Sequence, residues 1–294
     1  MHIAGKRRDG YHELCGLVAF TAFGDHLFFE PANKREVREV VAKSAGCDGG
    51  ALKLTGPFAA ELSELTRKPD DNLVLRAVRL YEQRIGMSFA GRLVLEKMLP
   101  LASGVGGGSS DAAAALNLLQ DLAPSPASHF ELHELARQLG ADVPMCLLSK
   151  AQWVSGFGEK CQPVPDFPPL ACLLVNPLKK VSTAAIFRLL DAPPLAPGYR
   201  AEMPEFSSFS THTALLDWLA TQRNDLQAAA LASEPEIAKV LEVIAGDENC
   251  ELARMSGSGA TCFGLYRHEG EAREAAAIIA ADHPDWWVRA TVLG

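Results

Sequence analysis

The feature that most constrains this chain is a glycine-rich run between a strand-like and a helix-like segment. The strand-like segment is RLVLEKM, in which apolar Leu93 and Leu95 lie between polar Arg92 and Glu96. The helix-like segment is rich in alanine and leucine and follows Ser110. Glycines let backbone N–H groups turn toward a ligand, and a helix N-terminus adds unpaired donors and partial positive charge. The sequence therefore predicts an anion site here, and phosphate is the anion that fits best.

The spacing of the run matches neither of two common phosphate motifs. No lysine follows the glycines as in a Walker loop, and Ser109 occupies the place of the third glycine of a dinucleotide fingerprint. The alternative is a plain connection in which Ser109 or Ser110 caps the helix and Asp111 favours its dipole. Asp111 would repel a phosphate unless it turns away or a divalent cation lies between them, so we expect magnesium nearby.

The length and composition of the chain limit the classes of protein to which it can belong. A chain of 294 residues is comfortable for two domains, and 48% hydrophobic with 22% charged residues is typical of a globular protein. The formal charge of -8 disfavours binding to nucleic acid or to an anionic membrane. Seven scattered cysteines without a Cys-x-x-Cys pair favour neither disulfides nor zinc. With no signal-like or membrane-length segment, these features predict a cytoplasmic protein.

The N-terminal half predicts alternating strands and helices. Residues 8–11 form a turn, and the apolar segments 14–23 and 26–30 are expected to pair as antiparallel strands. Between residues 33 and 66, the polar, glycine-containing stretch around Lys43 to Gly50 favours a hairpin or a short excursion, and residues 51–54 favour a weak strand. A helix is expected over 72–84, with Leu73, Ala77, Val78 and Leu80 on one face. A second helix begins at Ser128 with a capping box to Glu131 and stops at Gly140, and its expected buried stripe comprises Phe130, Leu135, Ala136 and Leu139.

The C-terminal half predicts a second domain. Residues 151–164 form a hairpin, and the prolines that follow mark a boundary, giving domains 1–165 and 166–294. Residues 170–177 are a buried strand before a helix that starts near Ser182. Helices are expected over 213–222, 224–232, 234–245 and 271–282, and strands over 261–266 and 286–292. The glycine-serine motif at 256–260 is a tight turn on its pattern alone.

The run PLASGVGGGSSDAAAAL resembles the phosphate loop of the GHMP kinases. Five further stretches support the resemblance in order along the chain, namely residues 5–14, 71–73, 140–144, 223–226 and 255–260. It implies an α+β, two-domain fold, with a ribosomal protein S5 domain 2-like N-terminal domain and a ferredoxin-like α/β C-terminal domain. It also implies an ATP-dependent phosphotransferase whose acceptor is a hydroxyl of a cytidine diphosphate sugar alcohol, on a route to isoprenoid precursors.

The resemblance assigns roles to individual residues. Asp142 is the expected catalytic carboxylate, although a turn or cap role explains its position from pattern alone. The ATP-binding residues it implies are Asn72, Lys97, Gly104, Val105, Gly106, Gly107, Gly108, Ser109 and Ser110, with Ser109 the candidate for Mg²⁺. The substrate-binding residues it implies are Tyr11, His12, Thr183 and Phe187, and the loop at 256–260 supports the site. From pattern alone, helix capping is the stronger explanation of Asn72. Capping explains Thr183, and core packing explains Phe187, almost as well as substrate binding does.

Members of the resembled family carry a Pro-Ala-Lys-x-Asn strand before the segment that matches residues 1–5, and the sequence given does not contain it. The expectation is either a start further upstream or the loss of part of the catalytic pocket. Two alternatives follow: another small-molecule GHMP kinase, or a catalytically impaired nucleotide-binding protein. The sequence is compatible with a monomer or a homodimer.

Overall fold

The computed structural model describes residues 1–32, 52–205 and 211–294. The chain forms two compact units, each composed of separate stretches. Unit 1 comprises Met1–Phe23, Ala102–Val105 and Ser149–Gly294, and unit 2 comprises Gly24–Leu101 and Gly106–Leu148. The hairpin expected around Lys43 to Gly50 lies outside the described residues. The domain boundary between residues 165 and 166 stays a prediction.

The sheet of unit 2 has three described strands in the order β3-β5-β4. The central strand β5, Gly91–Glu96, pairs antiparallel with β3, His26–Pro31, and parallel with β4, Leu52–Thr55. The strand predicted before the glycine run is therefore confirmed. Helix α2, Ala59–Leu65, follows β4 and was not predicted, because no residue in it is buried and its apolar pattern is weak.

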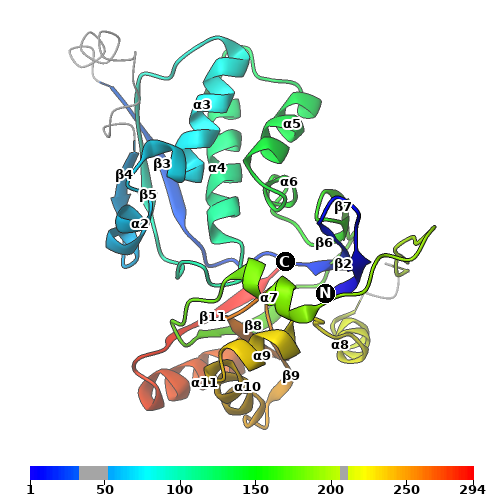
Figure 1. Cartoon of the computed structure of the whole chain (residues 1–294). Coiled ribbons are helices and arrows are strands. Elements are labelled where there is room, and N and C mark those ends of the chain that lie inside the picture. Colours follow the sequence, from blue (N-terminus) through cyan, green and yellow to red (C-terminus); the bar gives the residue numbers. More distant parts are fainter. Residues whose placement is uncertain (33–51, 206–210) are drawn as a thin grey trace. The chain divides into compact units, whose positions relative to one another are not determined.

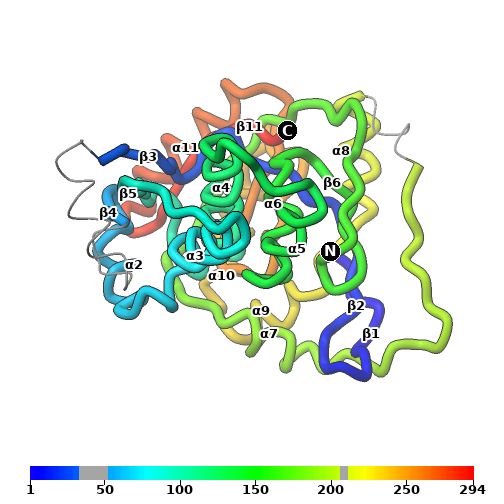
Figure 2. Tube along the Cα trace, turned by 90° about the horizontal axis from the view of Figure 1, so that it is seen from above, coloured from blue at the N-terminus to red at the C-terminus, as the bar shows by residue number. Residues whose placement is uncertain are grey.

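Four helices follow in unit 2: α3 (Leu73–Ile85), α4 (Gly107–Leu122), α5 (His129–Leu139) and the short α6 (Val143–Cys146). Helix α4 packs against the other three (Figures 1 and 2). Three of its alanines, Ala112, Ala113 and Ala115, are fully buried. The η1 turn, Pro69–Asp71, leads into α3.

Two of the predicted helices have nearly their expected ends, and their buried faces match the prediction in part. Ser128 and Glu131 form the capping box of α5, and Gly140 is its C-cap, as predicted. Phe130 is 74% exposed, so its place in the buried stripe was wrong, and Leu132 is buried instead. Helix α3 buries Ala77, as predicted, together with Val74 and Tyr81, whereas Leu73, Val78 and Leu80 of the expected face are only half-buried.

The first sheet of unit 1 has the order β1-β2-β6-β7. Its strands are β1 (His2–Lys6), β2 (His12–Val18), β6 (Gln152–Gly156) and β7 (Lys160–Pro163). The β6–β7 hairpin confirms the prediction for 151–164. Strand β2 pairs with β1 and β6 rather than with β3, so the expected pairing of the two N-terminal apolar segments was wrong. A partner that is distant in sequence leaves no local signal.

The second sheet of unit 1 is antiparallel, in the order β11-β8-β10-β9. Its strands are β8 (Leu170–Asn176), β9 (Cys250–Met255), β10 (Cys262–Tyr266) and β11 (Trp287–Leu293). The helices of this unit are α7 (Thr183–Leu190), α8 (His212–Thr221), α9 (Gln227–Ser233), α10 (Glu236–Ala245) and α11 (Glu269–Asp282). Apart from shifts of a few residues at their ends, these elements confirm the predictions, except that strand β9 was not predicted.

The core of unit 1 lies between this second sheet and helices α7, α9, α10 and α11 (Figure 1). Every residue of β8 is buried. Beyond β2, Phe20 exchanges two backbone hydrogen bonds with Gly294, and Ala22 N–H donates to Val292 O at 2.8 Å. An N-terminal segment thus pairs along β11. In the described parts of the chain, no helix is both long and apolar enough to cross a membrane.

Candidate active site

Helix α4 begins inside the glycine run. Gly106 is its N-cap with φ of 69°, a left-handed conformation that favours glycine, and the helix starts at Gly107. Ser109 and Ser110 therefore lie within the first turn, so the alternative in which one of them caps the helix was wrong. Ser110 N–H donates to Gly106 O at 2.9 Å, and the amides of the three preceding residues come before the helical ladder. That turn is a source of donors for an anion.

The beginning of the run packs on the second glycine motif within unit 1. Gly104 has φ of 76°, and a Cβ placed on it would lie 2.4 Å from Gly259 O. Ser256 Oγ donates to Gly104 O at 3.0 Å, and Thr261 N–H donates to Ser103 O at 3.0 Å. Gly259 N–H also donates to Ser256 O at 2.9 Å, so the second motif is a tight turn as well as a support for the first. This contact requires glycine at position 104.

Asn224 holds the same motif from the other side. Its Nδ2 donates to Met255 O at 3.0 Å and to Gly257 O at 2.8 Å. The motif at 223–226, singled out from the sequence, therefore shapes the second glycine loop.

Lys97 lies in a buried cluster with two carboxylates of unit 2. Its Nζ donates to Asp25 Oδ2 at 2.5 Å and to Asp111 Oδ2 at 2.7 Å, and the three side chains are 2%, 3% and 8% exposed. Asp111 is thus turned into the protein and paired, which removes its expected repulsion of a phosphate. Asp25 was missed by sequence reasoning, because a single Asp before a strand carries no motif. A role for Lys97 in binding ATP stays a prediction.

Two carboxylates share one ammonium in this cluster, and the pKa of Asp111 reflects that imbalance. The pKa of Asp111 is raised to about 7, chiefly because the carboxylate is buried; Lys97 opposes the rise and the charge of Asp25 adds to it. The group therefore favours its neutral form more in the folded than in the unfolded protein. The contribution of Asp111 to the free energy of unfolding is fully present below the pKa that this group has in the unfolded state. It is lost as pH rises through the pKa of the folded state.

Asp111→Asn is expected to flatten the pH dependence of stability between pH 4 and pH 7. The asparagine leaves the Asp25–Lys97 ion pair in place, and that pair has no net charge; the asparagine itself has no proton to lose. The free energy of unfolding of the variant should therefore exceed that of wild type by about 1–3 kcal/mol across that range. Urea unfolding at a series of pH values measures this. Asp121→Asn, on the exposed side of the same helix, serves as the control. Equal slopes for wild type and Asp111→Asn would contradict the assignment.

Asp142 occupies the N-cap position of α6, but its carboxylate caps nothing. This carboxylate accepts no hydrogen bond from a described residue. Asp142 is exposed at the surface, and the protein atoms around its carboxylate desolvate it enough to raise its pKa above the ordinary value. The backbone carbonyl of Asp142 accepts a hydrogen bond from Cys146 Sγ at 3.2 Å. A turn residue with an uncommitted carboxylate of raised pKa suits proton acceptance.

Asn72 is the N-cap of α3. Its Oδ1 accepts from Val74 N–H at 2.9 Å and from Leu75 N–H at 3.4 Å, which confirms the capping interpretation. The position of a Cβ on Gly108 lies 3.8 Å from Leu73 Cδ1, so the starts of α3 and α4 are neighbours. A contact of Asn72 with ATP stays a prediction.

The four residues predicted to bind substrate, Tyr11, His12, Thr183 and Phe187, all lie in unit 1, and each contacts another residue of that unit. The His12 and Phe187 rings are 4.7 Å apart at their centroids, and Tyr11 lies 5.1 Å from Phe157. Tyr11 is 57% exposed, so its face is open for stacking. Thr183 Oγ1 is 2.8 Å from Ser258 Oγ in the second glycine motif. Sequence reasoning missed Phe157, whose only signal is an aromatic residue in the β6–β7 turn.

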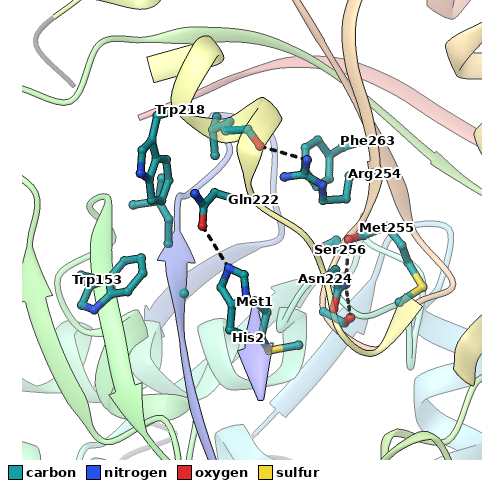
Figure 3. A pocket seen from close by; sticks show the side chains of 14 residues that line it. Met1, His2, Trp153, Trp218, Gln222, Asn224, Arg254, Met255, Ser256 and Phe263 are labelled. Atoms are coloured by element: carbon teal, nitrogen blue, oxygen red, sulfur yellow. Dashed lines mark hydrogen bonds between the residues drawn. The ribbon is translucent and has the colours of Figure 1, made fainter. Parts of the chain in front are cut away.

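A cavity of about 140 Å³ in unit 1 borders the second glycine motif, because Asn224, Ser256 and Gly257 are among its lining residues (Figure 3). Trp153 and Trp218 line one side of it, and Arg254 donates to Leu219 O at 3.0 Å. His2 and Gln222 are hydrogen-bonded at 3.0 Å on another side. None of the residues predicted to bind ATP or substrate lines this cavity.

Two family models match the chain. "GHMP kinases N terminal domain" matches residues 72–150, and "GHMP kinases C terminal" matches residues 208–285. These ranges include the glycine run, Asp142 and the second glycine motif.

Relatives that match over the full length of the chain narrow the assignment within the GHMP kinases. The chain is 44% identical to the 4-diphosphocytidyl-2-C-methyl-D-erythritol kinase of Parvibaculum lavamentivorans, over 100% of this chain and 94% of that protein. It is also 44% identical to the kinase of the same name from Dinoroseobacter shibae, over 100% of this chain and 91% of that protein.

Solved structures show the same fold. A crystal structure of 4-(cytidine 5'-diphospho)-2C-methyl-D-erythritol kinase matches with a TM-score of 0.74 and 30% identity, covering 99% of this chain and 94% of that one. Homoserine kinase from Cytophaga hutchinsonii matches with a TM-score of 0.61 at 15% identity, over 97% of this chain and 88% of that one, which shows the fold alone. The predicted α+β fold of this family is confirmed, and the chain belongs to the GHMP kinases and, among them, to the 4-diphosphocytidyl-2-C-methyl-D-erythritol kinase family.

Proposed function

We propose that this protein transfers the γ-phosphate of ATP to the 2-hydroxyl of 4-diphosphocytidyl-2-C-methyl-D-erythritol, a step of the non-mevalonate route to isoprenoid precursors. The observation that carries the proposal is the 44% identity, over the whole chain, to kinases named for that substrate. The exposed Tyr11 and the His12–Phe187 ring pair support a nucleobase-bearing acceptor over a smaller alcohol.

The chemistry follows from the donors and acceptors already described. The glycine run and the first turn of α4 would hold the phosphates through backbone N–H groups and the helix dipole. Asp142 would orient the acceptor hydroxyl and take its proton late, because a loose phosphoryl-transfer transition state needs little base assistance early. The barrier falls through alignment and charge neutralisation, without a covalent enzyme intermediate.

The first turn of α4 fits a magnesium ion brought in with the nucleotide. Mg²⁺ in kinase sites takes one or two protein ligands, and substrate phosphates and water supply the rest. Ser109 Oγ is a partly exposed hydroxyl in that turn, and no hydrogen bond to it from a described residue is present. A hydroxyl suits a hard cation, and Ser109 is the residue we propose as its ligand. Bound there, the ion would offset the negative charge of the phosphates.

On the substrate side, Tyr11 would stack on the cytosine while His12 contacts its polar edge. Phe187 packs on the His12 ring and would fix its orientation. Thr183, paired with Ser258, would present a hydroxyl beside the second glycine motif.

The proposal is tested by a steady-state assay of the purified chain with ATP and the cytidine diphosphate substrate, beside a panel of homoserine, mevalonate and galactose. Turnover of the cytidine substrate alone supports the proposal. Preference for a smaller alcohol would favour another GHMP kinase, and ATP binding without any turnover would favour an impaired nucleotide-binding protein. A parallel chain extended upstream by a Pro-Ala-Lys-x-Asn segment tests whether that strand raises kcat.

Tyr11→Ala is expected to raise KM for the cytidine substrate about tenfold or more, because base–aromatic stacking contributes roughly 1–3 kcal/mol. KM for ATP should change less than about twofold. Phe130→Ala is the matched control, since Phe130 is an exposed aromatic side chain of α5. A larger effect on ATP than on the cytidine substrate would mean that the base site is misassigned.

A cytoplasmic location, suggested by the scattered cysteines, and a monomeric or homodimeric state stay predictions.

A further inference from the structure

Asp25 concentrates an unusual number of hydrogen bonds on one buried carboxylate. It directly precedes β3, and its side chain is 3% exposed. Its Oδ1 accepts from Met98 N–H at 2.6 Å and from Leu99 N–H at 2.9 Å, and its Oδ2 accepts from Lys97 Nζ at 2.5 Å. Three consecutive residues therefore donate to one side chain. Charge-assisted bonds of this kind are about twice as strong as neutral ones.

The three donors lie where β5 ends and the chain leads to the glycine run. Lys97 is also held by its backbone, because its N–H donates to Thr55 O at 2.8 Å and its carbonyl accepts from Phe58 N–H at 3.2 Å. Met98 and Leu99 have Asp25 as the acceptor of their amides. Buried amides without an acceptor are costly, so Asp25 determines the path of the chain at this point.

The same ion pair lies against the start of α4. A Cβ on Gly107 would be 3.3 Å from Lys97 Nζ and 3.6 Å from Asp25 Oδ2. Lys97 also donates to Asp111 on the second turn of α4 at 2.7 Å. The Asp25–Lys97 pair therefore contacts both the residues before the glycine run and the helix after it, all within unit 2.

We propose that Asp25 is a positioning residue of the ATP site, which holds residues 97–99 and the first turn of α4 in a fixed relation so that the helix amides face the phosphates. The inference rests on the proposed function, because it concerns the same nucleotide site. Asp25 acts through Lys97 and the backbone and does not itself touch ATP.

The test compares two variants that each replace one carboxylate of the same cluster by the isosteric amide. Asp25→Asn weakens the acceptor of two backbone amides and turns an amide donor toward Lys97. Asp111→Asn leaves all three bonds of Asp25 in place. We expect the Kd for ATP, measured by calorimetry on protein shown to be folded by circular dichroism, to rise at least tenfold in Asp25→Asn. In Asp111→Asn the rise should be at least fivefold smaller, and KM for the cytidine substrate should change less than threefold in Asp25→Asn.

An Asp25→Asn protein that is folded and binds ATP within twofold of wild type overturns the proposal, as does an equal loss in Asp111→Asn. Amide exchange in the wild-type protein provides a test that needs no variant. Met98 and Leu99 should be protected at least a thousandfold without nucleotide, and exchange at the rate of an open loop overturns the proposal. Because ATP affinity is measured by binding, a protein that binds ATP but does not phosphorylate the cytidine substrate refutes the proposed function and leaves the Asp25 result interpretable.

Discussion

Asp142→Asn is expected to lower kcat by about 10²–10⁴-fold while the Kd for ATP stays within about twofold of wild type. The amide keeps the size of the carboxylate but cannot accept the proton of the attacking hydroxyl. The carboxylate of Asp142 caps no helix, so the substitution should leave the fold intact. Steady-state kinetics and calorimetric ATP binding measure the two quantities.

The pH profile adds a second readout for Asp142. Desolvation raises its pKa above the ordinary value, and a base must be ionised to act, so wild-type kcat should fall as pH falls through that raised pKa. The residual rate of Asp142→Asn should lack this limb. Asp121→Asn, an exposed aspartate of α4, should retain both the rate and the profile. Normal turnover in Asp142→Asn would remove this residue from the mechanism.

Gly104→Ala is expected to destabilise the protein by about 3 kcal/mol or more. The left-handed backbone at position 104 costs an alanine roughly 1–2 kcal/mol, and its Cβ would also lie 2.4 Å from Gly259 O, a backbone atom that cannot rotate away. Gly86→Ala is the matched control, because Gly86 has φ of 68° and open space around its Cβ position. It should lose only the backbone contribution.

Urea unfolding of both variants separates the two causes. Equal losses would mean that the packing of the first glycine loop on the second adds nothing to stability. A folded Gly104→Ala protein should also bind ATP more weakly, since Gly104 would have to move away from Gly259.

Local sequence signals predicted those parts of the fold that neighbouring residues determine. The ends of α5 follow from the Ser128–Glu131 capping box and Gly140, and the burial of β8 follows from an unbroken apolar run. The partner of β2 was wrong, because β6 lies far along the chain and hydrophobicity does not encode which strand is adjacent.

The candidate site, too, could be predicted from the sequence only in part. The glycine run indicated a phosphate site at the start of a helix, but the exact start depends on the left-handed conformation of Gly106, which no pattern specifies. The inward turn of Asp111 depends on Lys97 and Asp25, which converge only once β3, β5 and α4 have packed. The role of a residue that depends on such contacts between distant segments can be recognised only in the three-dimensional structure.

The pairing of residues 20–22 with the last strand has a consequence for biosynthesis. Phe20 leaves the ribosome long before Gly294, its hydrogen-bonding partner, has been translated. At synthesis rates of about 5–20 residues per second the delay is on the order of tens of seconds. Throughout that interval the nascent segment exposes unpaired backbone groups. A trigger-type chaperone that shields emerging chains should therefore improve the yield of native enzyme more than it improves that of proteins whose edge strands pair with near neighbours.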